Sequence, residues 1–465
     1  MTKLPDVTAE GAKRAVLEYT ARMAAKGKEA RAFILTFGCQ QNEADSEKLR
    51  GLCNEMGYGA AKTPEEADLI LVNTCAVREH AELKALSTIG QYKHLRAKNP
   101  SLLIGVCGCM VAQKHRVDEL KNSYPYVSFT FEPSSLDRFP KILWETMQSQ
   151  KRFFSLGENA GKISEGIPIL RDNSAKAWVS IMYGCNNFCS YCIVPYVRDR
   201  ERSREYPYIV EEVRALVNSG VKEITLLGQN VNSYNGGCTF AALLEKLASI
   251  EGDFLIRFMT SHPKDVSDEL IHVMANSPRI AKQFHLPLQS GSDAVLQAMN
   301  RHYNKSHYLE IVYKLRAAMP DITLTTDIIV GFPGETDSDF EETLSVLSDV
   351  RFDMLYSFIY SPRSGTPAAA RTDQVPEQVK SARMQRLLAL QNRISLEKNQ
   401  ESVGKILRVL AEGPSKNDPS TFTGRAESNK LVHFAGDDAC IDQFVNIKIT
   451  RAEPFNLHGE IMKEV

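Results

Sequence analysis

Residues 177–198 read AWVSIMYGCNNFCSYCIVPYVR and combine an apolar run with three closely spaced cysteines. Its apolar beginning, residues 177–183, is typical of a strand, and Cys185, Cys189 and Cys192 follow it in the spacing C-x3-C-x2-C. A tight loop with three thiolates suits an iron–sulfur cluster, which cysteines hold and whose full set of protein ligands would be four. Because the loop offers three, one iron would remain free to bind a ligand on which chemistry is done.

Two other interpretations of this loop are a zinc site that lacks a ligand and a group of structural thiols. Zinc sites usually combine a C-x2-C pair with a second pair downstream. The chain has no such second pair. The spacing therefore favours the cluster.

The composition is that of an ordinary globular protein: 465 residues, 43% hydrophobic and 24% charged. This length allows roughly three domains, and the net charge of −1 gives no general attraction to nucleic acid. Ten cysteines are too few for a disulfide scaffold and indicate a reducing compartment with metal chemistry. No apolar run approaches the ~20 residues of a membrane span, and residues 8–30 resemble a short surface helix rather than a targeting peptide. We expect a cytoplasmic protein without membrane contact.

Short apolar strands alternate with helices from residue 31 to about residue 152. We expect strands at 32–36, 69–72 and 102–106, and helices at about 43–56, 78–98 and 114–121. This alternation predicts an open parallel α/β sheet covered on both faces.

After a polar linker at 157–174 the alternation starts again with about six units. Strands are expected at 178–183, 223–227, 254–260, 283–288, 324–330 and 354–360, with helices such as 210–219, 240–250 and 340–349. Six units are fewer than the eight of a closed barrel and predict a partial, open (β/α)6 barrel, whose active site would lie at the C-terminal strand ends. A helix at 377–400 leads out of this domain.

The last part of the chain changes to short strands separated by turns, at 406–411, 422–425, 430–434 and 444–450. This spacing predicts a small all-β barrel. The expected domains are therefore 31–152, 175–400 and 401–465.

Three further cysteines, Cys39, Cys75 and Cys109, each follow an expected strand of the first domain. Ligands of open parallel sheets bind outside the carboxyl ends of the strands, so these distant thiols can converge on a second cluster. The alternative is that they are small buried hydrophobic residues. Cys107 competes with Cys109, which we prefer because Cys107 still belongs to the strand. Cys53, Cys238 and Cys440 are expected to take no part.

Loops with glycine and polar residues follow three strands of the expected barrel, at 228–230, 289–292 and 331–335. Glycine permits close approach of the backbone to a ligand, and amide and hydroxyl groups suit a nucleoside with an amino-acid tail. The candidate cofactor-binding residues are Gly228, Gln229, Gln289, Ser290, Gly331, Gly334 and Glu335.

These motifs together resemble the radical S-adenosylmethionine superfamily and, within it, the methylthiotransferases. The resemblance runs from about residue 31 to the end and includes TFGCQQN at Cys39, NTCAVRE at Cys75 and CGCMVAQ at Cys109. It implies two 4Fe–4S clusters, one held by Cys185, Cys189 and Cys192 and an auxiliary one by Cys39, Cys75 and Cys109. It also implies S-adenosylmethionine as cofactor, with two molecules used per turnover, and a C-terminal TRAM barrel that binds RNA.

Within this family, LLGQNVNSY (226–234) and YGCNNFCSYCIVPYVR (183–198) resemble the branch that modifies N6-isopentenyladenosine in tRNA, the MiaB-type enzymes. The implied activity is addition of a methylthio group at C2 of that nucleoside. Alternatives are the same transfer to threonylcarbamoyladenosine or to a ribosomal-protein aspartate and, from another class, a non-catalytic RNA-binding protein with structural zinc. The family usually has Arg-Gly after the cluster loop, whereas this chain has Arg198-Asp199.

The C-terminal domain lacks the basic excess of an autonomous RNA-binding module. A usable RNA surface is expected from Arg425, Asn429, Lys430 and Arg451. Phe422 or His433 would stack on an unpaired base. We further expect tRNA and a reducing electron-donor protein as partners, and a monomer.

Overall fold

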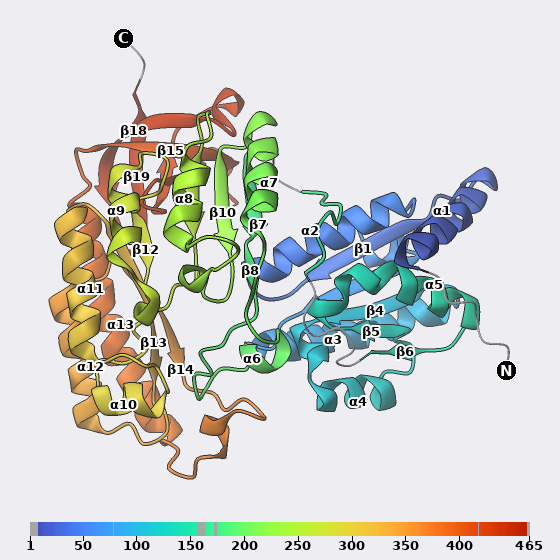
Figure 1. The fold of residues 1–465 in the computed structure, drawn as a ribbon, viewed down its shortest axis with the longest axis horizontal. Helices are drawn as coiled ribbons and strands as arrows, with labels where there is room; N and C mark the ends of the chain where they lie inside the picture. Colours follow the sequence, from blue (N-terminus) through green and yellow to red (C-terminus); the bar gives the residue numbers. More distant parts are fainter. Residues whose placement is uncertain (1–7, 78, 156–162, 172–173, 417, 463–465) are drawn as a thin grey trace. The chain divides into compact units, whose positions relative to one another are not determined.

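The computed structural model describes residues 8–77, 79–155, 163–171, 174–416 and 418–462 (Figure 1). The chain forms two compact units. The first unit comprises residues 1–172, 183–186 and 192–202, and the second comprises 173–182, 187–191 and 203–465. The division passes through the C-x3-C-x2-C loop, so that Cys185 and Cys192 belong to the first unit and Cys189 to the second.

The first unit contains a six-stranded parallel sheet in the order β2-β1-β3-β4-β5-β6. Its strands are β1 (Arg31–Thr36), β2 (Gly59–Ala60), β3 (Leu69–Thr74), β4 (Leu103–Gly108), β5 (Phe129–Phe131) and β6 (Phe153–Phe154). The helices are α1 (Ala9–Ala25), α2 (Gln40–Glu55), α3 (Glu79–Lys98), α4 (Lys114–Ser123), α5 (Phe139–Ser149) and α6 (Val194–Val197). The three expected strands are present, whereas β2, β5 and β6 were not predicted because two or three residues show no periodicity. Residue 78, the expected start of α3, and most of the expected linker lie outside the described residues.

Alternate side chains of β3 enter different hydrophobic layers, as a sheet covered on both faces requires. Leu69 and Leu71 pack with α1, α2 and α5, while Ile70 and Val72 pack with α3 and α4. The expected surface helix at the N-terminus is partly buried, because Ala12 and Val16 of α1 lie on one face and are closed off from solvent.

The second unit begins with six parallel strands: β7 (Lys176–Ser180), β10 (Glu223–Leu227), β11 (Leu255–Phe258), β12 (Gln283–His285), β13 (Thr323–Val330) and β14 (Met354–Ile359). They form two three-stranded sheets, β7-β10-β11 and β12-β13-β14. Backbone bonds of Ile256 with Arg279 and Ala281 connect the two. Among the described residues no pairing joins β7 to β14, so the barrel is open, as expected.

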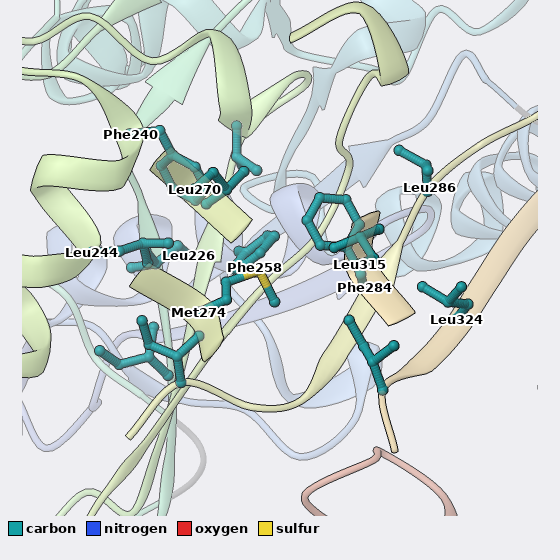
Figure 2. Close-up of a cluster of buried hydrophobic side chains, with 14 of the residues drawn as sticks. Leu226, Phe240, Leu244, Phe258, Leu270, Met274, Phe284, Leu286, Leu315 and Leu324 are labelled. Carbon is teal, nitrogen blue, oxygen red and sulfur yellow. The ribbon is translucent and has the colours of Figure 1, made fainter. Parts of the chain in front are cut away.

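Helices surround this barrel: α7 (Tyr206–Asn218), α8 (Phe240–Ala248), α9 (Asp268–Asn276), α10 (Asp293–Ala298), α11 (Lys305–Ala318), α12 (Asp337–Val350) and α13 (Glu377–Gln400). The expected strand 178–183 is divided, since β7 ends at Ser180 and the short β8 (Met182–Tyr183) follows; β9 (Arg202–Ser203) is equally short. Figure 2 shows the hydrophobic core between strands and helices. Phe258 lies at its centre and meets Phe240 and Phe284 edge to face at ring distances of 5.1 and 5.4 Å.

The C-terminal part is a closed five-stranded barrel in the order β15-β16-β17-β19-β18. Its strands are β15 (Ile406–Pro414), β16 (Phe422–Ala426), β17 (Leu431–Phe434), β18 (Phe444–Ala452) and β19 (Asn456–Ile461). The polar strand β19 was not predicted.

This small barrel attaches at the amino-terminal ends of the parallel strands. Arg257 of β11 pairs with Glu223 at 2.7 Å and donates to the carbonyl oxygens of Ala426 and Glu427. Lys430 pairs with Asp353, which directly precedes β14, at 3.1 Å. The C-terminal strand ends, where the cofactor loops are expected, are therefore at the opposite end from the small barrel. In the described part of the chain no helix has the length and apolar character required to cross a membrane.

Candidate metal centres

The ends of β1, β3 and β4 bring Cys39, Cys75 and Cys109 together in the first unit. Cys39 precedes α2, Cys75 directly follows β3 and Cys109 directly follows β4. The thiols of Cys39 and Cys109 both lie against Asn42 Oδ1, at 3.7 and 4.0 Å. Cys75 is held close to the same place, because an added Cβ on Gly38 would lie only 2.8 Å from Cys75 Cβ. The convergence expected from strand topology is thus present.

Cys107 and Cys109 have different surroundings. Cys107 is a residue of β4 and packs in the hydrophobic layer that contains Cys53 and Phe129. Burial raises the pKa of Cys109 to about 12, Arg198 opposes this shift, and the nearby thiols of Cys39 and Cys75 add to it. Cys109 lies beside Asn42 Oδ1 together with Cys39, whereas Cys107 packs in the hydrophobic layer; Cys109 as the third ligand stays a prediction.

A buried guanidinium completes this site. Arg198, only 5% exposed, donates from Nε to Cys109 Sγ at 3.1 Å and from Nη2 to Asn42 Oδ1 at 2.8 Å. It also pairs with the buried Asp45 at 2.9 Å. Asn42 in turn donates to the carbonyl oxygens of Phe37, which directly follows β1, and Thr74, the last residue of β3. A positive charge beside a thiol favours its thiolate, the form that binds metals.

The donor set fits an iron–sulfur cluster better than a single ion. Within the described residues no three His, Cys, Asp or Glu side chains are arranged to surround one metal ion. A single zinc ion needs such a tetrahedral arrangement. Cysteines on a four-iron cluster bind different irons, so their sulfurs have to border a common space rather than meet at one atom. Three thiols lie on adjacent strand ends here, and a cluster bound to them stays a prediction.

In the first unit, the turn around Asp199 supports the backbone of Cys185, whose N–H donates to Asp199 O at 3.2 Å. Gly184 has φ +74°, and an added Cβ would lie 2.2 Å from Arg200 O. Asp199 itself has φ +65°, in the left-handed region that asparagine and aspartate tolerate better than other non-glycine residues. The turn therefore has a conformation suited to glycine, with an aspartate at this position. Cys192 is half-buried.

In the second unit Cys189 has its own buried arginine. Arg301 donates from Nη1 to Cys189 Sγ at 3.2 Å and from Nη2 to Pro287 O at 3.1 Å. Its Nε donates to the hydroxyl of Tyr303 at 3.1 Å. Sequence reasoning missed both arginines. Arg198 lies within the quoted motif and could have been noticed, whereas nothing in the sequence around Arg301 marks it.

The expected cofactor loops all lie at C-terminal strand ends of the second unit, after β10, β12 and β13. Gly228 is packed on Met182, and Gln289 has φ +69°. Ser290 is buried against Thr343. Glu335 accepts from Gly331 N at 2.7 Å and pairs with Arg383 at 2.7 Å. Gly334 has φ +79°. Ser290 and Glu335 therefore hold the loops in place, and direct contact of these seven residues with a cofactor stays a prediction.

A group of buried polar atoms lies at the ends of β10 and β11; Asn230 belongs to the expected loop 228–230, whereas Ser261 and His262 were not predicted. Among the described residues, Asn230 Oδ1, Ser261 Oγ and His262 Nε2 have no hydrogen-bond partner. Thr260, which precedes two of them, has φ +72°, a strained conformation for a β-branched residue. Burial, with the charge of Arg301 adding to it, lowers the pKa of His262 and keeps its ring neutral. Such atoms are candidates for hydrogen bonds to a ligand.

The candidate RNA-binding residues differ in their exposure to solvent and in the partners that they already have. Arg425 donates to Asn429 O at 3.1 Å, and Asn429 has φ +63° in the turn between β16 and β17. Lys430 is largely buried and pairs with Asp353, whereas Arg451 is 61% exposed beside Glu453. The expectation that Phe422 could stack on a base is wrong, because alternation along β16 places this ring inside the barrel core. His433 is half-buried and stacks on His458 at 5.2 Å.

Known proteins match nearly the whole length of the chain. Residues 179–347 match the radical SAM superfamily, residues 31–132 match the uncharacterized protein family UPF0004, and residues 400–462 match the TRAM domain. The tRNA-2-methylthio-N(6)-dimethylallyladenosine synthase of Thermoanaerobacter sp. (strain X514) is 51% identical over 444 residues, 95% of this chain and 94% of that protein. The protein of the same name from Acetivibrio thermocellus is 50% identical over 94% of this chain and 92% of its own.

Among solved structures, the radical S-adenosylmethionine methyltransferase TsrM from Kitasatospora setae, with cobalamin and a [4Fe-4S] cluster bound, superposes with a TM-score of 0.54. It shares 12% sequence identity and is matched over 73% of this chain and 74% of its own, so this likeness concerns the fold alone. The radical SAM match implies a 4Fe–4S cluster and S-adenosylmethionine as cofactors. By its identity over nearly its full length, the chain belongs to the family of tRNA-2-methylthio-N(6)-dimethylallyladenosine synthases.

Proposed function

We propose that this protein is a tRNA methylthiotransferase that adds a methylthio group to C2 of N6-isopentenyladenosine at position 37, next to the anticodon. One observation carries the proposal: Cys39, Cys75 and Cys109 meet at adjacent strand ends beside Arg198. They do so in a chain 51% identical to a synthase named for this product. A second cysteine set is what distinguishes sulfur insertion from a reaction that needs only radical generation.

Each part of the chain has a separate task in this proposal. When bound, two 4Fe–4S clusters and S-adenosylmethionine would supply the radical, the methyl group and the site for sulfur. Residues 175–400, with Cys185, Cys189 and Cys192, hold the first cluster, and residues 31–152, with Cys39, Cys75 and Cys109, hold the second. Residues 401–465 bind RNA. The protein works in the cytoplasm as a monomer with a reducing electron-donor protein.

The chain's own residues prepare both sites. Arg301 and Arg198 each place a guanidinium against one cysteine of a set, which favours thiolates in a buried setting. Neutral His262, with Asn230 and Ser261, offers uncharged hydrogen-bonding groups at the strand ends. Such groups suit a nucleoside better than an ion.

Nucleoside mass spectrometry of tRNA tests the proposal. Cells that lack the protein should accumulate N6-isopentenyladenosine and lose its 2-methylthio derivative, and the wild-type gene should restore it. Unchanged levels of this derivative, with loss of a methylthio group from threonylcarbamoyladenosine or from a ribosomal protein, would reject the assigned substrate.

The RNA surface can be tested with two barrel residues. Arg451→Ala should weaken tRNA binding a few-fold and reduce the salt slope by about 1, as loss of one phosphate contact does. Lys430→Ala should instead lower thermal stability, because it leaves the buried carboxylate of Asp353 without its ion pair. A tRNA titration at two salt concentrations, together with melting curves, separates these outcomes.

A further inference from the structure

The side chain of Arg198 reaches one predicted cluster ligand, and its neighbour in the chain supports another. Its guanidinium contacts Cys109 Sγ at 3.1 Å, and the carbonyl oxygen of the next residue, Asp199, accepts from Cys185 N at 3.2 Å. Both contacts lie within the first unit. One turn thus touches both cysteine sets.

The environment of Arg198 requires an explanation beyond packing. The side chain is buried, and burying a guanidinium is unfavourable unless it is paired and hydrogen-bonded. Asp45 and Asn42 supply partners at 2.9 and 2.8 Å, yet the Nε–H points at a sulfur rather than at an oxygen. The ion pair with Asp45 does not account for the hydrogen bond from Arg198 Nε to the Cys109 thiol.

We propose that Arg198 is a positioning residue of the auxiliary site, which fixes the Cys109 thiolate and places a buried positive charge, partly balanced by Asp45, against the cluster that this set holds. This inference rests on the proposed function, since it assumes an auxiliary cluster. A fixed positive charge beside a cluster stabilises its reduced, more negative state and therefore raises its potential. Hydrogen bonds to the sulfurs are a known means of setting cluster potentials.

Because Arg198 and Asp45 carry charges of opposite sign, neutralising them one at a time should shift the midpoint potential of the cluster in opposite directions. The full chain with Cys185, Cys189 and Cys192 all replaced by Ala retains only the auxiliary set, so a single cluster can be titrated anaerobically and followed by electron paramagnetic resonance. In this background Arg198→Gln should lower the midpoint potential. We expect about a tenfold change in the ratio of reduced to oxidised cluster, or 59 mV for a one-electron couple. Asp45→Asn should raise the potential, and Arg198→Lys should restore part of the Arg198→Gln loss.

A matched control is Arg204→Gln, which removes another buried arginine, paired with Glu212 at 2.8 Å in the second unit. It should leave the potential unchanged. Shifts of the same sign in Arg198→Gln and Asp45→Asn, or no shift in either at normal iron content, would overturn the assignment. If Arg198→Gln does not fold, the other two variants test the assignment. Relative to the parent background, Arg198→Lys should lower the midpoint potential by less than Arg198→Gln would, and Asp45→Asn should raise it. Absence of any cluster from the parent background would reject the auxiliary cluster itself, and with it the proposed function.

Discussion

The two cysteine sets of this protein are built in opposite ways. Cys185, Cys189 and Cys192 lie within eight residues of one loop, whereas Cys39, Cys75 and Cys109 come from three strands that are neighbours in the sheet. The loop set is encoded locally and its spacing alone identifies it. The strand-end set exists only after the parallel sheet has formed, so its integrity depends on the fold of the whole first unit.

Both sets nevertheless include a buried arginine on one thiol, and the partners of these arginines differ. Arg198 pairs with the carboxylate of Asp45, while the described partners of Arg301 are hydroxyl, carbonyl and thiol groups. The positive charge at Cys109 is therefore partly balanced and the one at Cys189 is not. The two cysteine sets therefore differ in the charge that lies beside them.

Removal of the loop set should have the largest effect. Replacing Cys185, Cys189 and Cys192 together with Ala should abolish cleavage of S-adenosylmethionine, because no other cysteine on the loop can hold the iron that binds it. The measurement is 5′-deoxyadenosine by chromatography after anaerobic reconstitution. Formation at the wild-type rate would show that cleavage occurs elsewhere.

Removal of the strand-end set should abolish methylthiolation without abolishing cleavage of S-adenosylmethionine. With Cys39, Cys75 and Cys109 replaced by Ala, about half of the bound iron should disappear, as expected for loss of one of two similar clusters. Methylthiolation should cease while uncoupled cleavage of S-adenosylmethionine continues, because the loop set is untouched. Iron and sulfide analysis with nucleoside mass spectrometry checks both parts, and an unchanged iron content contradicts an auxiliary cluster.

The same contrast explains what could be predicted from sequence. The open barrel, the parallel sheet and the family follow from periodicity and motif spacing, and β10 and α13 begin and end at the expected residues. Arg301 could not be found, because its contact with Cys189 joins residues 112 positions apart. Lys430 looked like an exposed basic residue, and only the packing of the small barrel shows that Asp353 neutralises it. Phe422 was expected on the surface of the small barrel. Its side chain faces the core because the pairing of β16 with β15 and β17 sets which residues point inward.

Variants of Cys107 and Cys109 test which of these two cysteines is the third ligand of the strand-end set. Cys109→Ala should remove the auxiliary cluster, since this thiol lies with that of Cys39 against Asn42 Oδ1. Cys107→Ala should leave iron content unchanged and cost about 1 kcal/mol of stability, from a small cavity in the hydrophobic layer. Iron analysis and denaturant unfolding of both variants distinguish them. The reverse pattern would assign the third ligand to Cys107.

The smallest effect is expected at Asp199, the residue of positive φ that follows Arg198. Asp199→Gly should be nearly neutral, because glycine relieves the φ of +65° but adds backbone entropy to the unfolded chain, each by roughly 0.5–1 kcal/mol. The pair with Arg202, at 3.6 Å, adds little at a partly exposed site. Asp199→Val keeps the backbone contact to Cys185 available in principle but forces a β-branched residue into the left-handed region, at a cost of about 2 kcal/mol. Unfolding curves and iron retention at the loop set, measured in a background without Cys39, Cys75 and Cys109, should show a loss in Asp199→Val alone. Equal retention in both variants would mean that the turn does not support Cys185, and that the loop set is held by its own eight residues.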